Sequence, residues 1–131
     1  MRQLFLGFCL LLVTGCADSA TGPSTPLDIS FTLRPGESRR IEGESLSIRF
    51  VGVFADSRCP ADAICIQGGS AEVRIAAVWG LATDSYTLHT GTMAPVEHGG
   101  LTIALVELAP YPFSSNPIAP GDYRATLRVS R

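Results

Sequence analysis

The chain has 131 residues, which is enough for one folded domain with a single core. It carries ten basic residues, all arginine, against twelve acidic residues, and its formal net charge is −2. Because no basic stripe is present, the composition argues against nucleic acid as a partner.

The first residues have the features of an exported protein. Arg2 precedes an uninterrupted apolar run over residues 4–13, and small residues follow it. A positive charge, a short apolar run and small residues before a cleavage point predict a secretory signal peptide over residues 1–15. The run is too short for a transmembrane helix, which needs about 20 residues.

The end of this segment, Val13-Thr14-Gly15-Cys16, resembles the bacterial lipobox. The resemblance implies that the chain is a bacterial lipoprotein, that a diacylglyceryl group is attached to the Cys16 thiol, and that cleavage occurs before Cys16. Acyl chains such as palmitate would then anchor the protein, at about 0.8 kcal/mol per buried methylene. Ala17, rather than aspartate, follows Cys16, which implies sorting to the outer membrane. The alternative is an ordinary signal peptide that happens to contain a cysteine.

Residues 16–27 are small, polar and proline-bearing, and they predict a flexible tether. From residue 28 the apolar residues recur with period two, which predicts strands. The segments with this pattern are 29–33, 38–42, 46–53, 71–79, 85–90, 101–106 and 123–129. The alternation changes phase near Phe50 and at Val106, which predicts bulges.

Seven strands, each with one apolar face, predict a single all-β domain over residues 28–131, an antiparallel β-sandwich. The stretch PGDYRA, residues 120–125, resembles the entry to a late strand of immunoglobulin-like sandwiches. That resemblance implies a hydrogen bond from Tyr123 back to the preceding loop. The position of Trp79 does not fit the immunoglobulin Cys-Trp-Cys pattern, so membership of that family is not expected. The expectation is an antiparallel sandwich, with an immunoglobulin-like arrangement as the form that the resemblance implies.

The cysteine count predicts one disulfide. Cys9 leaves with the signal peptide and Cys16 is assigned to lipid, so Cys59 and Cys65 remain in an exported protein, where disulfides persist. A bridge between them closes a ring of seven residues, which should stabilise the fold by about 2 kcal/mol.

The loop that holds Cys59 and Cys65 has three alternative roles besides stabilising the fold through a disulfide. A metal site needs further ligands, and neither His89 nor His98 is directed to the loop by the pattern. A redox pair favours C-x-x-C at a helix N-terminus, which this spacing lacks. A protease inhibitor could present Arg58 beside Cys59 on a rigid ring.

The favoured interpretation is that the disulfide only stabilises the loop. Asp56, Arg58 and Asp62 are then expected to be solvated loop charges. The DSRCP stretch also resembles small uncharacterised secreted bacterial proteins over about residues 45–80. That resemblance implies a recurring scaffold and brings no activity with it.

A second candidate is the proline-rich stretch 108–123, which holds Tyr111 and Phe113 on a stiff loop. Either these rings fold back and cap the open end of the sandwich, which is favoured, or they serve as binding anchors. The pattern provides no nucleophile with an oriented base, so no enzyme, metal or cofactor is expected.

The sequence therefore predicts a lipid-anchored envelope protein with a non-catalytic binding or structural role. Its expected partners are the membrane, through the lipid on Cys16, and another envelope protein. The alternative is a protease inhibitor or ligand-binding module that uses the Arg58 loop.

Overall fold

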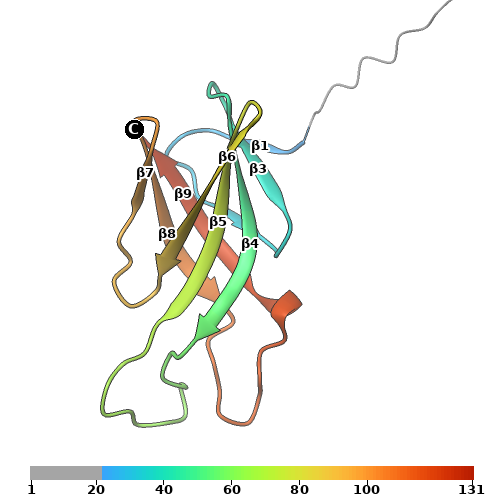
Figure 1. Ribbon diagram of the computed structural model, residues 1–131. Coiled ribbons are helices and arrows are strands. Elements are labelled where there is room, and N and C mark those ends of the chain that lie inside the picture. Colours follow the sequence, from blue (N-terminus) through green and yellow to red (C-terminus); the bar gives the residue numbers. More distant parts are fainter. Residues whose placement is uncertain (1–21) are drawn as a thin grey trace, which may run out of the picture.

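The computed structural model describes residues 22–131. The expected signal peptide, Cys16 and residues 16–21 of the expected tether lie outside the described residues. The described part of the chain is a two-layer β-sandwich with one short 3-10 turn, η1 (Pro120–Asp122), and this confirms the expected fold class (Figure 1).

The two sheets contain five and four strands. The larger has the order β1-β3-β4-β5-β6 and is made of β1 (Ser24–Thr25), β3 (Ser38–Ile41), β4 (Leu46–Asp56), β5 (Ala71–Trp79) and β6 (Ala82–His89). The smaller has the order β2-β9-β8-β7 and is made of β2 (Phe31–Leu33), β9 (Arg124–Ser130), β8 (Leu101–Ala109) and β7 (Val96–His98). All neighbours are antiparallel except β1 and β3, which are parallel.

One core lies between the sheets, and the period-two alternation places it there. In β5, for example, Val73 and Ile75 are buried, whereas Glu72 and Arg74 are partly exposed on the opposite face. Burying one aliphatic side chain of this size contributes about 1.5–3 kcal/mol. The largest fully buried side chains are Phe50, Leu33, Ile41, Leu46, Ile48, Ile75, Leu88, Ile103, Leu127, Val73 and Val129.

The predicted phase changes are present as register shifts. They lie between Phe50 and Gly52 on β4 and between Leu105 and Glu107 on β8. The extra residue lets two successive residues face outward, so the inward phase returns one residue later. Val51 and Val106 are therefore exposed, and Val53 and Leu108 face inward again.

The structure differs from the expected elements at the short strands. β1 and β7 were not predicted, because two or three residues cannot display a period. The expected tether, residues 16–27, extends too far into the chain, since Thr25 is buried in the sheet and Leu27 packs against the core. Ile29 was expected to face inward but is 54% exposed, because β2 begins only at Phe31.

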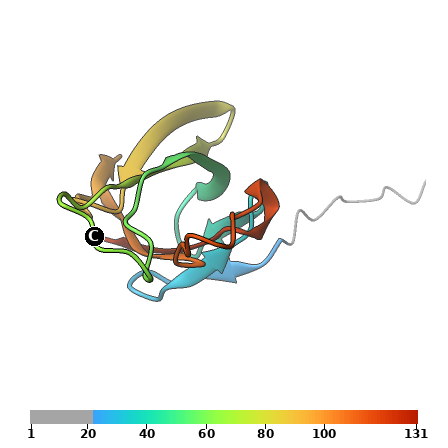
Figure 2. The same cartoon turned by 90° about the horizontal axis from the view of Figure 1, so that it is seen from below.

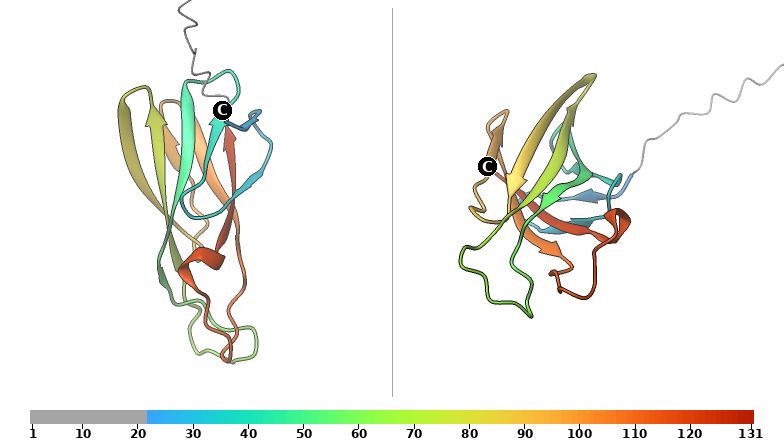
Figure 3. Two further views of the ribbon diagram at one scale, coloured as in Figure 1. Left: turned by 90° about the vertical axis from the view of Figure 1, so that its right-hand side faces the viewer. Right: turned by 60° about the horizontal axis from the view of Figure 1, so that its bottom comes forward.

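The sandwich has two distinct ends. The chain enters at the end that holds β1 and the hairpin between β3 and β4 (Figure 1). Two long loops, residues 57–70 and 110–119, project from the opposite end in both side views (Figures 1 and 3). We call these the cysteine loop and the proline loop, and together the tip.

Candidate functional site

The tip is built around the predicted disulfide. Cys59 and Cys65 are bonded, with their Cα atoms 6.0 Å apart, which confirms the expected pairing. The neck of the cysteine loop is closed by two serines. The Ser57 amide donates to the Ser70 carbonyl (3.0 Å), and the Ser70 amide donates to Ser57 Oγ (3.1 Å). The cysteine loop is therefore closed twice, by the disulfide and by the hydrogen bonds between Ser57 and Ser70.

Arg58 points into the molecule. Its Nε and Nη2 atoms donate to the two carboxylate oxygens of Asp56 at 2.9 and 2.7 Å. Nη1 donates to the carbonyl of Leu108 (2.9 Å) and Nη2 to that of Pro110 (3.0 Å). The side chains of Arg58 and Asp56 are only 6% and 13% exposed.

The expectation of solvated charges at Asp56 and Arg58 is therefore wrong. A buried guanidinium needs a negative partner and hydrogen-bond acceptors to offset its loss of water. Asp56 provides the negative charge, and Asp56 and the two carbonyls provide the acceptors. Arg58 is also not available to the specificity pocket of a trypsin-like protease. Asp62 does stay at the surface, as expected.

Tyr123 extends this network across the sandwich. Its hydroxyl donates to Asp56 Oδ2 at 2.9 Å, whereas the sequence resemblance implied a bond back to the preceding loop, and that implication is wrong. Burial, assisted by the hydrogen bond to Asp56, raises the pKa of Tyr123 to about 12. The hydrogen bond from Arg58 lowers the pKa of Asp56. We call Asp56, Arg58 and Tyr123, with the two carbonyls, the Arg58 clamp.

The two loops of the tip are also bonded directly to each other. The Ala61 amide donates to the Pro112 carbonyl at 2.9 Å. Asp62 Oδ1 accepts hydrogen bonds from the Ser114 amide (2.9 Å) and hydroxyl (3.1 Å). The hydrogen bond from the Ser114 amide is the main reason why the pKa of Asp62 is lowered. Figure 2 looks onto this end of the molecule. The loops therefore form one surface.

That surface is apolar. Ile64 and Ile66, on either side of Cys65, are fully exposed, and Tyr111 and Phe113 are 55% and 52% exposed. The favoured expectation that both rings cap the sandwich is not met, because each ring keeps half of its surface in solvent. Tyr111 lies 5.5 Å from the Arg58 guanidinium, which limits its movement.

Sequence reasoning selected Tyr111 and Phe113 but missed Ile64 and Ile66. A signal was present: a ring of seven residues is too small to bury two isoleucines that flank one of its own cysteines. The exposed pair follows from ring size alone.

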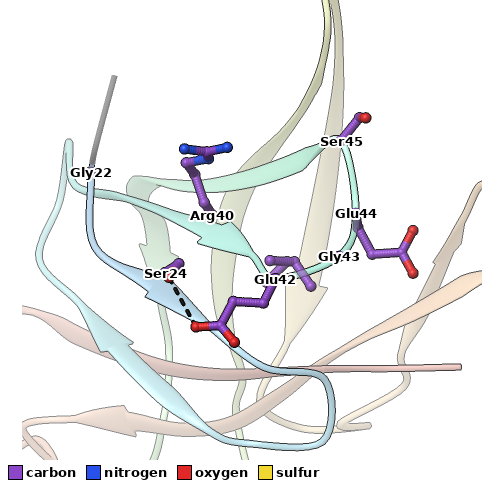
Figure 4. Close-up of a pocket in the computed structure, with 8 residues that line it drawn as sticks. Gly22, Ser24, Arg40, Glu42, Gly43, Glu44 and Ser45 are labelled. Atoms are coloured by element: carbon purple, nitrogen blue, oxygen red, sulfur yellow. Dashed lines mark hydrogen bonds between the residues drawn. The ribbon is translucent and has the colours of Figure 1, made fainter. Parts of the chain in front are cut away.

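One hollow adjoins the tip at Tyr111, and another lies at the opposite end of the sandwich. A cavity of about 220 Å³ lies beside the clamp and is lined by Arg58, Thr90, Met93, Glu107, Leu108, Ala109 and Tyr111. A polar groove of about 450 Å³ lies at the opposite end, where Ser24 donates to Glu42 (Figure 4). Neither lining holds a histidine or a cysteine.

Neither histidine belongs to the tip, although His89 ends β6 close to the neck of the cysteine loop, where the Thr90 amide donates to the Ala71 carbonyl. His98 is buried, with Nδ1 2.9 Å from the Tyr86 hydroxyl and its ring against Trp79, and His89 is exposed on β6. Within residues 22–131 no three histidine, cysteine or acidic side chains are grouped to hold a metal ion. No helix in this part of the chain has the length and apolar character to cross a membrane.

Comparison of the chain with protein-family models, with curated proteins and with solved structures finds no match. The site is therefore interpreted from its own geometry.

Proposed function

We propose that this chain is an exported, lipid-anchored module that binds a second envelope protein through its tip and performs no catalysis. The observation that carries the proposal is that Ile64 and Ile66 are fully exposed on the cysteine loop while Tyr111 and Phe113 are half-exposed on the proline loop bonded to it. Clustered apolar side chains at the surface of a small domain are typical of interaction sites. Tyrosine and phenylalanine are effective anchors in such sites.

The rigidity of the tip supports binding. The disulfide, the neck at Ser57 and Ser70 and the bonds between the loops hold these side chains in place before a partner arrives. Binding to a preorganised surface avoids much of the ordering cost that a flexible loop would incur.

The alternative of an inhibitor that presents Arg58 to a protease receives no support, because all of its donor nitrogens bond within the clamp. A ligand-binding role for the cavity beside the clamp would depend mainly on Thr90 and Glu107, because four of the five N–H groups of Arg58 are bonded within the clamp.

The tip can be tested in intact cells. A photo-crosslinking amino acid at position 64 of the full-length chain should yield one discrete adduct with another envelope protein, and Ile66→Ser should weaken that adduct. The same probe at Ser45, at the opposite end, is the control. Identical adducts from positions 64 and 45, or none from position 64, would contradict the proposal.

The anchor is tested separately by labelling with radioactive palmitate. We propose that Cys16 carries the lipid, and Ala17 favours the outer membrane as its destination. The label should be incorporated into the wild-type protein and be absent from Cys16→Ala. Incorporation that persists in Cys16→Ala would refute the anchor and leave the proposal for the tip standing.

A further inference from the structure

The outer face of the five-stranded sheet is the second unusual surface of the molecule. Burial alternation and strand register place the side chains of Arg40, Arg49 and Arg74 on this face. Ser38 pairs with Arg49, Arg40 with Ser47, and Arg49 with Ala76, so the arginines lie on neighbouring strands β3, β4 and β5. We call this surface the basic face.

Around Arg49 and Arg74 the basic face has little compensating negative charge, whereas Arg40 lies with Glu42 in the groove at the end of β3 (Figure 4). Glu72 is the one acidic residue among the outward positions of β3, β4, β5 and β6 within the described chain. Arg49 and Arg74 form no ion pair with any residue in 22–131. Because the whole chain has a net charge of −2, positive charge is concentrated here against the overall balance.

Apolar side chains lie among the arginines. Val51 is 39% exposed and Phe54 is 54% exposed, and the Arg74 guanidinium lies 3.6 Å from the centre of the Phe54 ring. An aromatic ring held under an arginine, with an aliphatic neighbour, suits the boundary between lipid headgroups and acyl chains. An arginine whose guanidinium is only solvated by water would not require an aromatic ring beneath it.

The chain enters the domain at the edge of this same sheet, through β1, which pairs with β3. Cys16 and Gly22 are six positions apart in the sequence, so an extended segment between them would reach about 20 Å. A linker of this length would keep the domain close to the membrane. It is still long enough for the sheet to lie on the membrane that holds the lipid.

We propose that the basic face rests on an anionic lipid surface. This inference rests on the proposed lipid anchor, which supplies the membrane, and it deepens the proposed function by orienting the domain. The tip then points along the membrane surface, toward a partner that is itself held there. The lipid headgroup is recognised by charge: each arginine near an anionic surface strengthens binding about fivefold.

The test uses the mature chain with Cys16→Ala, which carries no acyl chain, so its outcome does not depend on lipidation. Flotation is measured with vesicles of phosphatidylglycerol and phosphatidylcholine in equal amounts, and with pure phosphatidylcholine. We expect binding to the anionic vesicles that weakens as salt is added. Arg49→Gln combined with Arg74→Gln should weaken it about 30-fold, and Phe54→Ser should weaken it further.

The matched control removes the same charge elsewhere. Arg128 is exposed on β9 of the four-stranded sheet, and Arg34 is exposed directly after β2 of the same sheet. Arg34→Gln combined with Arg128→Gln should change binding by less than about twofold, because these charges lie on the far side of the sandwich. Equal losses in the two double variants, equal binding to both kinds of vesicle, or no binding at all would overturn the proposal. Circular dichroism confirms that each variant is folded.

Discussion

Arg58 satisfies main-chain carbonyls where β8 ends. The carbonyls of Leu108 and Pro110 both accept hydrogen bonds from this one guanidinium at the end of the strand. Arg58 supplies the donors from a different part of the chain, and Asp56 balances its charge. The clamp therefore connects the cysteine loop with the end of the other sheet.

Removal of the guanidinium should be costly. In Arg58→Met the Asp56 carboxylate and two carbonyls lose their donors, so we expect the free energy of unfolding to fall by about 3 kcal/mol. Urea denaturation measures the loss. Arg128→Met, at an exposed position, is the control and should change stability by less than about 0.5 kcal/mol. Similar values for both variants would show that the clamp does not stabilise the fold.

The raised pKa of Tyr123 predicts how the stability of the fold changes at alkaline pH. Its pKa rises from the ordinary 10.0 to about 12 on folding, so the folded state holds the phenolic proton more tightly. The resulting stabilisation is complete below pH 10 and is lost as the pH rises toward 12. Tyr123→Phe should be less stable near neutral pH and should decline less between pH 10 and 12. An unchanged decline, measured by denaturation at each pH, would contradict this assignment.

At the scale of elements, the neck of the cysteine loop leaves no room for a side chain. A Cβ atom at Gly69 would lie 1.5 Å from the Ser57 carbonyl oxygen, whereas one at Gly68 would meet nothing within 4 Å. These two adjacent glycines therefore form a matched pair for a test of the neck.

Gly69→Ala should lower the free energy of unfolding by about 2 kcal/mol or more, because the main chain itself must move. Gly68→Ala should stay within about 0.5 kcal/mol of the wild type. Thermal denaturation of both variants with the disulfide intact gives the comparison. A tolerated Gly69→Ala would mean that the neck is not closed in solution.

The longer strands could be predicted from the sequence, because a buried face leaves a period of two in the chain. The three-residue β2 could also be predicted, because Phe31 and Leu33 continue an apolar alternation that starts at Ile29. The bulges near Phe50 and Val106 could also be predicted, since an extra residue changes the phase of that pattern. β1 and β7 are too short to carry a period. The clamp could not be predicted, since Asp56 and Tyr123 are 67 positions apart and meet only through the packing of the two sheets.

At the scale of the whole molecule, the surfaces are segregated. The chain enters at one end, the apolar tip lies at the other, and the basic face runs between them (Figure 3). This arrangement separates the residues proposed for binding from those that hold the fold together, so the two can be altered independently.

Ile64→Ser combined with Ile66→Ser should therefore leave the free energy of unfolding within about 0.5 kcal/mol of the wild type, because both side chains are already exposed in the folded state. The matched replacement Ile48→Ser, in the core, should be strongly destabilising. Urea denaturation tests both. A large loss from the tip variant would mean that these isoleucines are buried in solution.

The parallel pairing of β1 with β3 has a mechanical consequence. A domain held by lipid at its N-terminus and by a partner at its tip comes under tension along its length. The pull first reaches β1, where the Arg40 amide donates to the Pro23 carbonyl and the Glu42 amide to the Thr25 carbonyl. Detachment of residues 24–27 would lengthen the linker by about 13 Å. The contact of Leu27 with the core would be lost, whereas the clamp and the disulfide would stay intact, so β1 can yield under force before the rest of the fold unfolds.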